Sequence, residues 1–215
     1  MKRILQCRTS CVLVIIMAVI FNFRSTLVVA QTTKNATDVV VQSEEKIALN
    51  FHTLINKYRA EKLMLPLVWN DTLALAAKNH NKWMGVNDRL DHVERTKGDF
   101  YTGRDVTDRI NYAAKMKGEL YCGENILFFD FLLDTTSVIS DSTAVMLAQE
   151  AFEIWRESPG HNANMLHPYM LHGASFHYAN GLIWATNVFC GENNSRYYQS
   201  TSRKLKLFFR KMKQK

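Results

Sequence analysis

Two short runs, Cys122-Gly-Glu-Asn-Ile126 and Trp155-Arg-Glu-Ser-Pro-Gly-His-Asn-Ala-Asn-Met-Leu166, flank an apolar stretch with helical spacing. In the first run a carboxylate follows a glycine, and in the second a histidine follows a Pro-Gly pair. A glycine before a polar side chain lets the backbone turn sharply and brings that side chain close to another element. We therefore expect Glu124 and His161 to converge in the folded chain, with the upstream His92 as a third candidate.

Residues 1–30 have the layout of a secretory signal peptide. Basic residues open the chain, an apolar run follows, and small residues precede Gln31. The apolar run is shorter than the roughly 20 residues that span a bilayer. The favoured interpretation is cleavage after Ala30, which makes the protein secreted and extracellular. The alternative is an uncleaved membrane anchor, because Arg24 interrupts the approach to the cleavage site and Val28 stands at its first small position.

Charge is distributed unevenly along the 215 residues, whose formal net charge is +7. The leader holds four basic and no acidic residues, and Arg203–Lys215 holds seven basic and no acidic residues. The body between them is therefore acidic on balance. This argues against a nucleic-acid-binding fold, which spreads basic residues over its folded surface.

The basic C-terminal tail, residues 192–215, mixes cations with apolar residues such as Leu205, Leu207 and Phe208. A basic amphipathic segment of this kind predicts peripheral contact with an anionic membrane or an acidic polysaccharide. A solubilising segment is the alternative. The sequence alone favours neither.

Capping residues and helical spacing predict the first two helices. A polar linker, residues 31–42, precedes a helix that starts at Ser43. The second helix starts at Asn70 or Asp71 and carries His80 on its apolar face. We expect His80 to be a satisfied core residue rather than a ligand, because it lies in an otherwise apolar stripe.

From Gly85 to Gly103 the helical period is lost, so we expect a loop that carries His92. Loops held by rigid helices are common places for functional residues. A short helix follows over residues 105–116. Another helix begins at the cap Ser142 and ends at Pro159. Its expected buried stripe consists of Val145, Ala148, Phe152 and Trp155.

The C-terminal part of the body predicts strands. Residues 174–178 and 182–189 flank an Asn180-Gly181 pair, which is the strongest short signal for a β-hairpin. Residues 126–133 are apolar and fit either a strand or a helical turn. The fold class is therefore α+β, with helices packed on a small, largely antiparallel sheet.

Cys122 and Cys190 remain once the leader is removed, and they lie in a chain bound for an oxidising compartment. A disulfide between them is expected, and two buried free thiols are the alternative. Asn35, Asn70 and Asn193 each begin a sequence that accepts N-linked glycans.

The residues His92, Glu124 and His161 fit two kinds of chemistry. Two histidines and a carboxylate suit a divalent metal that keeps an open coordination position. They also suit acid–base catalysis by a poised glutamate. Because they are far apart in sequence, they form no local metal motif.

Gly123-Glu-Asn-Ile126 and the Ser-Pro-Gly-His core of the second run resemble the CAP superfamily. This superfamily includes cysteine-rich secretory proteins, insect venom antigens and plant pathogenesis-related proteins. Three further segments fit the same pattern: Asn56-Lys-Tyr-Arg59, Leu65-Pro-Leu-Val-Trp69 and Trp184-Ala-Thr-Asn-Val-Phe189. The resemblance covers residues 43–191 as one CAP (SCP) domain. The Ser-Pro-Gly-His form is that of the branch seen in bacteria and some eukaryotes.

The resemblance implies an α-β-α sandwich whose central cleft holds two histidines and two glutamates. His92, Glu124 and His161 match the first histidine, the first glutamate and the second histidine. The second glutamate has no secure match, and Glu153 and Glu157 are its candidates. Three protein ligands and a water still suffice for Zn²⁺.

Three other histidines, His167, His172 and His177, match no position of the family pattern. We expect each of them to pack at the surface or in the core.

The resemblance implies an extracellular binding protein for a lipid, sterol, glycan or protein ligand. Its cleft would bind a divalent cation, with Zn²⁺ as the candidate, through His92, Glu124 and His161. The first alternative is an enzyme, a metal-assisted hydrolase with Glu124 as base, and the sequence favours it less. The second alternative is a display scaffold held at a membrane by the leader or the basic tail.

Overall fold

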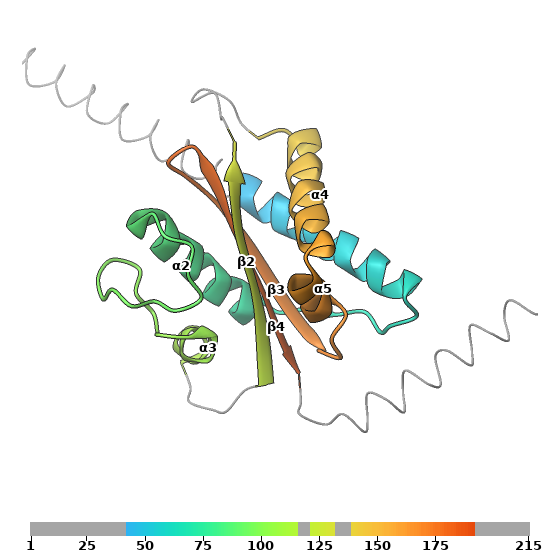
Figure 1. Cartoon of the computed structure of the whole chain (residues 1–215), viewed down its shortest axis with the longest axis horizontal. Coiled ribbons are helices and arrows are strands. Elements are labelled where there is room, and N and C mark those ends of the chain that lie inside the picture. The colour runs from blue at the N-terminus through green and yellow to red at the C-terminus, as the bar shows by residue number, and fades with distance from the viewer. Residues whose placement is uncertain (1–41, 116–120, 132–138, 192–215) are drawn as a thin grey trace, which may run out of the picture. The chain divides into compact units, whose positions relative to one another are not determined.

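The computed structural model describes residues 42–115, 121–131 and 139–191 (Figure 1). The leader, the linker up to residue 41 and the basic tail lie outside the described residues, as do Asn35 and Asn193. In the described part, no helix is long and apolar enough to cross a membrane.

An N-terminal helix covers residues 42–61, so Gln42 is already helical, one residue before the predicted start. The elements that follow are β1 (Val68–Trp69), α2 (Asp71–Asn87), α3 (Val106–Ala114), β2 (Tyr121–Asp130), α4 (Asp141–Glu157), α5 (Pro159–Met165), β3 (Leu171–Ala179) and β4 (Leu182–Gly191).

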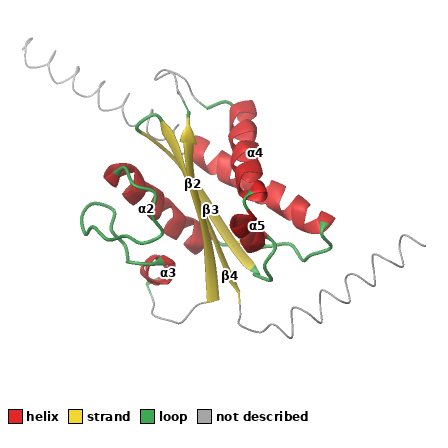
Figure 2. Ribbon diagram, in the orientation of Figure 1, coloured by secondary structure: helices red, strands yellow, loops and turns green. Residues whose placement is uncertain are grey.

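The strands form one sheet in the order β1-β3-β4-β2. The β3–β4 and β4–β2 pairs are antiparallel, and only the short β1 pairs in parallel with β3. Helices α2 and α3 lie on one side of the sheet, and the N-terminal helix, α4 and α5 lie on the other (Figures 1 and 2). The predicted α+β class, with an α-β-α sandwich and a largely antiparallel sheet, is confirmed.

The central strand β4 is buried on both faces, and it separates two cores. Ile183, Ala185 and Phe189 face the core shared with the N-terminal helix and α4. Trp184 and Val188 alternate with them and face the α2 side. Side chains of a strand alternate between the two faces of its sheet, so a nearly continuous apolar run is what a strand between two helical layers requires.

The predicted hairpin joins β3 to β4 through Asn180 and Gly181. Both residues have positive φ, 56° and 78°. A two-residue loop with this backbone matches the twist of the two strands, and asparagine followed by glycine is the pair that tolerates it best.

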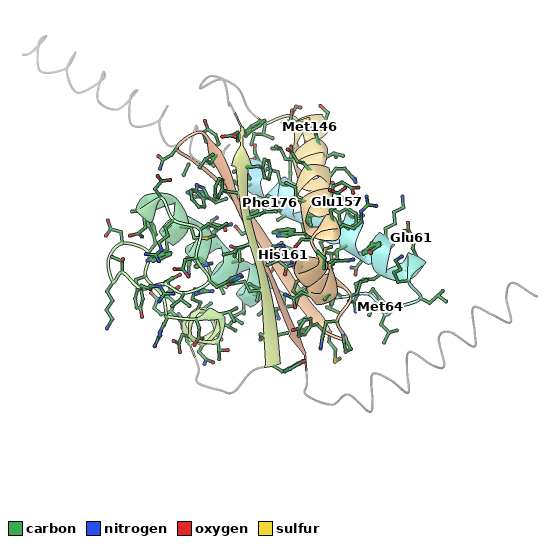
Figure 3. The ribbon with its side chains drawn as sticks, viewed as in Figure 1. Glu61, Met64, Met146, Glu157, His161 and Phe176 are labelled. Carbon is green, nitrogen blue, oxygen red and sulfur yellow. A yellow bond between two sulfur atoms is a disulfide. The ribbon has the colours of Figure 1, made fainter. Side chains whose placement is uncertain are left out.

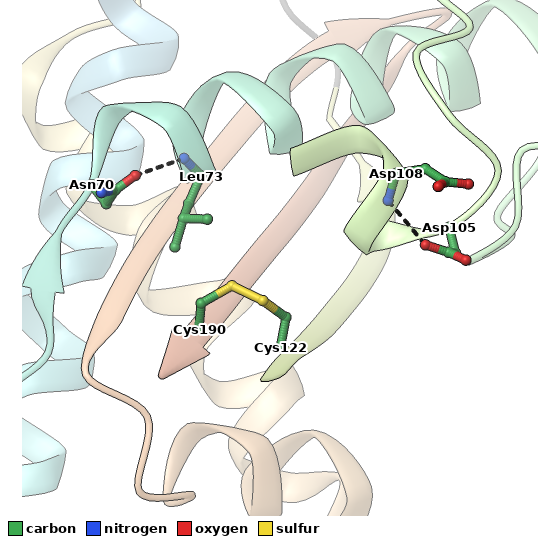
Figure 4. Close-up of a disulfide and its surroundings, with 6 residues drawn as sticks. All are labelled: Asn70, Leu73, Asp105, Asp108, Cys122 and Cys190. Carbon is green, nitrogen blue, oxygen red and sulfur yellow. Dashed lines mark hydrogen bonds between the residues drawn. A yellow bond between two sulfur atoms is a disulfide. The ribbon is translucent and has the colours of Figure 1, made fainter. Parts of the chain in front are cut away.

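A disulfide links Cys122 of β2 to Cys190 of β4, at positions that pair directly in the ladder (Figure 4). The predicted pairing is confirmed. Two helix caps lie nearby in the same view: Asn70 accepts the Leu73 N–H, and Asp105 accepts the Asp108 N–H. Asn70, rather than Asp71, is therefore the cap of α2.

The prediction of a loop from Gly85 was wrong, because α2 continues to Asn87. Gly85 does not end the helix. It allows the helix to pack closely on the sheet, against Ala179 of β3 and Trp184 of β4.

Two details predicted for α4 were also wrong. Its cap is Ser140 rather than Ser142, and Val145 is 50% exposed instead of buried. Pro159 does not simply end a helix, since it opens α5 after the non-helical Ser158. The first turn of a helix tolerates proline because its N–H has no intrahelical partner there. His161 therefore lies in the first turn of a new helix.

Residues 121–130 form strand β2, which resolves the open choice between strand and helical turn. The expected sharp turn at Gly123 was wrong, because this residue lies within the strand. A Cβ at Gly123 would lie 2.5 Å from the Tyr169 hydroxyl oxygen, so the glycine allows a close approach instead.

The three histidines outside the predicted site each have a hydrogen-bond partner. His167 Nε2 lies 3.0 Å from the Tyr121 hydroxyl, and His177 Nδ1 lies 2.8 Å from the Glu44 carboxylate. His172 is fully buried, as expected of a core residue.

The buried His172 belongs to an ordered chain of hydrogen bonds. Its Nε2–H donates to Asn187 Oδ1, so its Nδ1 accepts from His52 Nδ1–H at 2.8 Å. His52 Nε2 then accepts from Asn56 Nδ2 at 3.2 Å. This arrangement requires both imidazoles to be neutral. Burial, with a smaller contribution from the charge of His52, lowers the pKa of His172 to about 3.

We predict that acid destabilises the fold through His172. Its pKa is about 3 when folded and about 6.5 when unfolded, so the unfolded chain binds the extra proton between these values. The free energy of unfolding should fall by about 1.4 kcal/mol per pH unit below pH 6.5 from this residue. Denaturant unfolding at several pH values measures the slope. His172→Gln should flatten it, and an unchanged slope would contradict the assignment.

Candidate functional site

The site is built around the carboxylate of Glu124, which lies on the edge strand β2 and is almost fully buried. Its Oε2 accepts a hydrogen bond of 2.6 Å from Arg109 Nη2. Its Oε1 lies 2.9 Å from His92 Nδ1. Each oxygen therefore has a partner, and His92 has its Nδ1 fixed while its ring remains 53% exposed.

Arg109 is a buried cation on the inner face of α3. Besides Glu124, it donates to the backbone oxygens of His92 at 3.2 Å and of Arg104 at 3.3 Å. Its Nε lies 3.8 Å from Glu94 Oε1. A buried charge needs such partners, because an unpaired one is very costly away from water. Arg109 thus fixes the loop that carries His92 against the strand that carries Glu124.

A second buried carboxylate, Glu94, lies in the same cluster. Its Oε1 is 2.9 Å from His80 Nδ1, and its Oε2 accepts the Thr102 N–H at 3.1 Å. His80 is buried as expected, but it also borders the site, since its Nε2 lies 4.0 Å from Glu124 Oε1. That Nε2 has no hydrogen-bond partner among the described residues.

His161 approaches the same strand from the opposite helical layer. It lies in the first turn of α5, and its backbone oxygen accepts from Asn125 Nδ2 at 3.0 Å. Asn164, one turn later, donates to Asn125 Oδ1 at 2.8 Å and to the Glu124 backbone oxygen at 3.3 Å. These bonds hold α5 against β2, and Figure 3 shows His161 in front of the sheet. The His161 Nδ1 is buried without a partner in the described part of the chain.

The pKa directions agree with this convergence. Burial alone would raise the pKa of Glu124, but the His92 hydrogen bond and the nearby Arg109 and His80 lower it overall. The pKa of His161 is lowered by burial and then by the positive charge of His92. His92 and Glu124 are therefore in contact, and His161 is close enough to interact electrostatically with His92.

The two candidates for the second glutamate lie elsewhere. Glu153 pairs with Gln149 and Arg156 on α4, and it lines a shallow groove between α4 and the N-terminal helix. Glu157 is exposed at the end of α4. The carboxylate that joins the cluster is Glu94.

Sequence reasoning missed Glu94 and Arg109 and treated His80 as core alone. Arg109 could have been identified from the sequence. It shares the inward face of its helix with Val106 and Ala113, and a charge buried there must have a partner. His80 carried a similar signal in the apolar stripe of α2. Glu94 carried none, since it lies in a loop without periodicity.

The geometry bears on whether a metal fits. Within residues 42–115, 121–131 and 139–191, no group of three or more His, Cys, Asp or Glu side chains is placed to hold a metal ion. Both oxygens of Glu124 are occupied, and the Arg109 cation beside them disfavours a second cation in direct contact. Of the three predicted ligands, the two imidazoles rather than the Glu124 carboxylate keep an unoccupied donor atom, and for His161 this atom is the buried Nδ1.

We predict that His92→Ala raises the pKa of His161 toward 6.5, because the variant removes a neighbouring positive charge. An NMR titration of the imidazole resonances measures this pKa. His177→Ala is the matched control, since His177 pairs with Glu44, and it should leave His161 unchanged. An identical His161 titration in all three proteins would contradict the convergence.

Known proteins give an independent indication of the family. The profile of the cysteine-rich secretory protein family (CAP) matches residues 52–173, more than half of the chain. No curated protein matches the chain.

Among solved structures, an extracellular protein with an SCP domain from Bacillus anthracis is 21% identical with a TM-score of 0.52. That alignment covers 71% of this chain and 43% of the other, so this chain spans less than half of that protein's length. An outer surface protein from Borrelia burgdorferi is 15% identical with a TM-score of 0.47, over 65% of this chain and 88% of the other.

The family profile lies inside the predicted domain, residues 43–191, and it includes His92, Glu124 and His161. The fold agrees with that of the SCP-domain structure. The chain therefore belongs to the cysteine-rich secretory protein (CAP) family.

Proposed function

We propose that this CAP domain is an extracellular binding protein that binds a divalent cation through His92 and His161, with Zn²⁺ as the first candidate. The observation that carries the proposal is the 2.9 Å contact between His92 Nδ1 and the Glu124 carboxylate. A histidine that ligates a metal generally donates its other ring N–H to a carboxylate, which fixes the tautomer and the ring orientation. Glu124 supports His92 in this way.

The sequence suggested that Glu124 binds the metal directly, and we assign it a different role. Because Arg109 occupies one of its oxygens and His92 the other, we assign it to orienting His92. Water or a ligand group would complete a tetrahedral zinc site, in which an open position is typical of exchangeable binding.

Action outside the cell is supported by two features of the chain. The leader has the layout of a signal peptide, and the Cys122–Cys190 disulfide suits an oxidising compartment. The extracellular ligand belongs to this proposal as well, as a lipid, sterol, glycan or protein that the domain would bind.

A metal-assisted hydrolase is the second candidate function. The lowered pKa of Glu124 and its two partners make it a weak base. His92 is the better candidate for the base. Its Nδ1 is hydrogen-bonded to the Glu124 carboxylate, and its ring is exposed. His92 would then act as base instead of Glu124 and would not be available as a metal ligand, so the geometry supports this candidate less than the binding protein.

We expect purified protein to bind about one equivalent of Zn²⁺ near neutral pH. Isothermal titration calorimetry measures the stoichiometry and Kd. The variant His92→Ala/His161→Ala should lose this binding, and Glu124→Gln should weaken it by about 10- to 100-fold through loss of ring orientation.

The matched control is His167→Ala/His177→Ala, which removes two histidines that pair with Tyr121 and Glu44 rather than with the site residues. It should bind zinc like the parent. Equal binding by the parent and by His92→Ala/His161→Ala would refute the cation site.

A further inference from the structure

A groove with a volume of about 460 Å³ opens between the N-terminal helix and α2. It lies beside β1 and β3, at the edge of the sheet opposite to β2 and the site around Glu124. Ala174 and Ser175 of β3 close its floor, and both are buried, so the accessible lining comes from the two helices and from Trp69 of β1. A volume of this size is within the range of pockets that bind ligands.

Large apolar side chains stand exposed on both walls of the groove. Leu49 on the N-terminal helix is 53% exposed, and Leu75 on α2 is 45% exposed. Trp69 also lines the groove and is partly exposed. Apolar residues that gather in a hollow with polar residues around them mark a surface that binds another molecule or segment. We call this surface the Leu49–Leu75 groove.

The charged residues of the Leu49–Leu75 groove are mainly acidic. Each wall carries an exposed carboxylate, Glu45 on the N-terminal helix and Asp71 on α2. Glu44, the third acidic residue of the lining, is buried and bonded to His177. Lys78 is the basic residue of the lining. The accessible carboxylates outnumber this cation, so charge complementarity favours an occupant that is both apolar and positively charged.

The described residues end at Gly191, close to this groove. A Cβ at Gly191 would lie 3.4 Å from the Met170 nitrogen, and the Met170 oxygen accepts the Val68 N–H at 2.8 Å. Neighbouring strands are about 4.8 Å apart, which places Gly191 roughly 10 Å from Val68. Val68 directly precedes Trp69 of the groove. The chain therefore continues into residue 192 from a point beside β1.

The segment that follows has the composition that the groove favours. Arg203–Lys215 holds seven basic and no acidic residues. Leu205, Phe208, Phe209 and Met212 recur in it at the spacing of one face of a helix. Residues 192–204 span up to about 43 Å when extended, so the length of the chain allows this segment to reach the groove.

We propose that the Leu49–Leu75 groove binds this chain's own basic segment, residues 203–215. The four apolar side chains of the segment pack against Leu49, Leu75 and Trp69, and its lysines and arginines meet the carboxylates of Glu45 and Asp71. This is the binding mode of an amphipathic helix in an apolar groove.

Two consequences follow from docking within one chain. The tether holds the segment at a high effective concentration, so even weak contacts keep it in the groove. Docking and the membrane contact predicted from the sequence use the same apolar residues and exclude each other. The proposal is independent of the cation site, which lies at the other edge of the sheet.

Carbodiimide cross-linking of the purified protein, followed by peptide mass spectrometry, tests this contact. The reagent joins a lysine directly to a carboxylate, so only side chains in contact react. We expect cross-links from the lysines of residues 204–215 to Glu45 or Asp71. Phe208→Ser/Phe209→Ser keeps every charge and should lose these cross-links, because the apolar anchors are gone.

Two variants of α2 test the groove itself. Leu75→Arg places a cation in the groove and should also lose the cross-links. Val86→Arg, exposed on α2 but outside the lining, is the matched control and should cross-link like the parent. The Lys46–Asp141 pair, whose charged atoms are 2.6 Å apart, is the internal control and should cross-link in every variant.

An equal mixture of ¹⁵N-labelled and unlabelled protein distinguishes docking within one chain from docking between two copies. Cross-linked peptide pairs that carry a single label support the proposal. Pairs that combine both labels would assign the groove to a second copy and overturn it. Cross-linking of Lys46 to Asp141 without any link from the segment to Glu45 or Asp71 would also overturn it, as would links that persist unchanged in Phe208→Ser/Phe209→Ser or in Leu75→Arg.

Discussion

The site depends on one constraint, which is that a carboxylate buried at the edge of the sheet must have a partner for each oxygen. Glu124 satisfies it with Arg109 from α3 and His92 from the loop before α3. These contacts tie a helix and a loop to β2, in addition to the apolar contacts that Val106, Ile110 and Ala113 of α3 make. The exposed ring of His92 is therefore positioned by a buried charge pair rather than by its own packing.

The same strand also brings the second helical layer to the site. Asn125 and Asn164 bind the backbone of α5 and β2 to each other, which holds His161 against the strand that carries Glu124. Because β2 is an edge strand, elements from both helical layers can reach it. The Cys122–Cys190 disulfide secures this edge strand to the central strand β4 a few residues away.

Much of this could be predicted from sequence, because local signals were strong. The Asn180-Gly181 pair predicted the hairpin, and Glu124, one of the predicted site residues, does contact His92, although the sharp turn expected at Gly123 is absent. What could not be predicted depends on contacts between distant segments. Glu94 lies in a loop without periodicity, so its sequence context does not indicate a role. Only the folded chain places it against His80 and Arg109. The break between α4 and α5 was missed because proline both ends one helix and begins another.

A cation site between His92 and His161 is tested most directly by X-ray diffraction at the zinc absorption edge from crystals grown with Zn²⁺. We expect an anomalous peak about 2.0–2.1 Å from His92 Nε2 and from a ring nitrogen of His161. Glu124 should keep its bonds to Arg109 and His92. A peak bound directly to Glu124 with Arg109 displaced, or no peak between the two histidines, would contradict it.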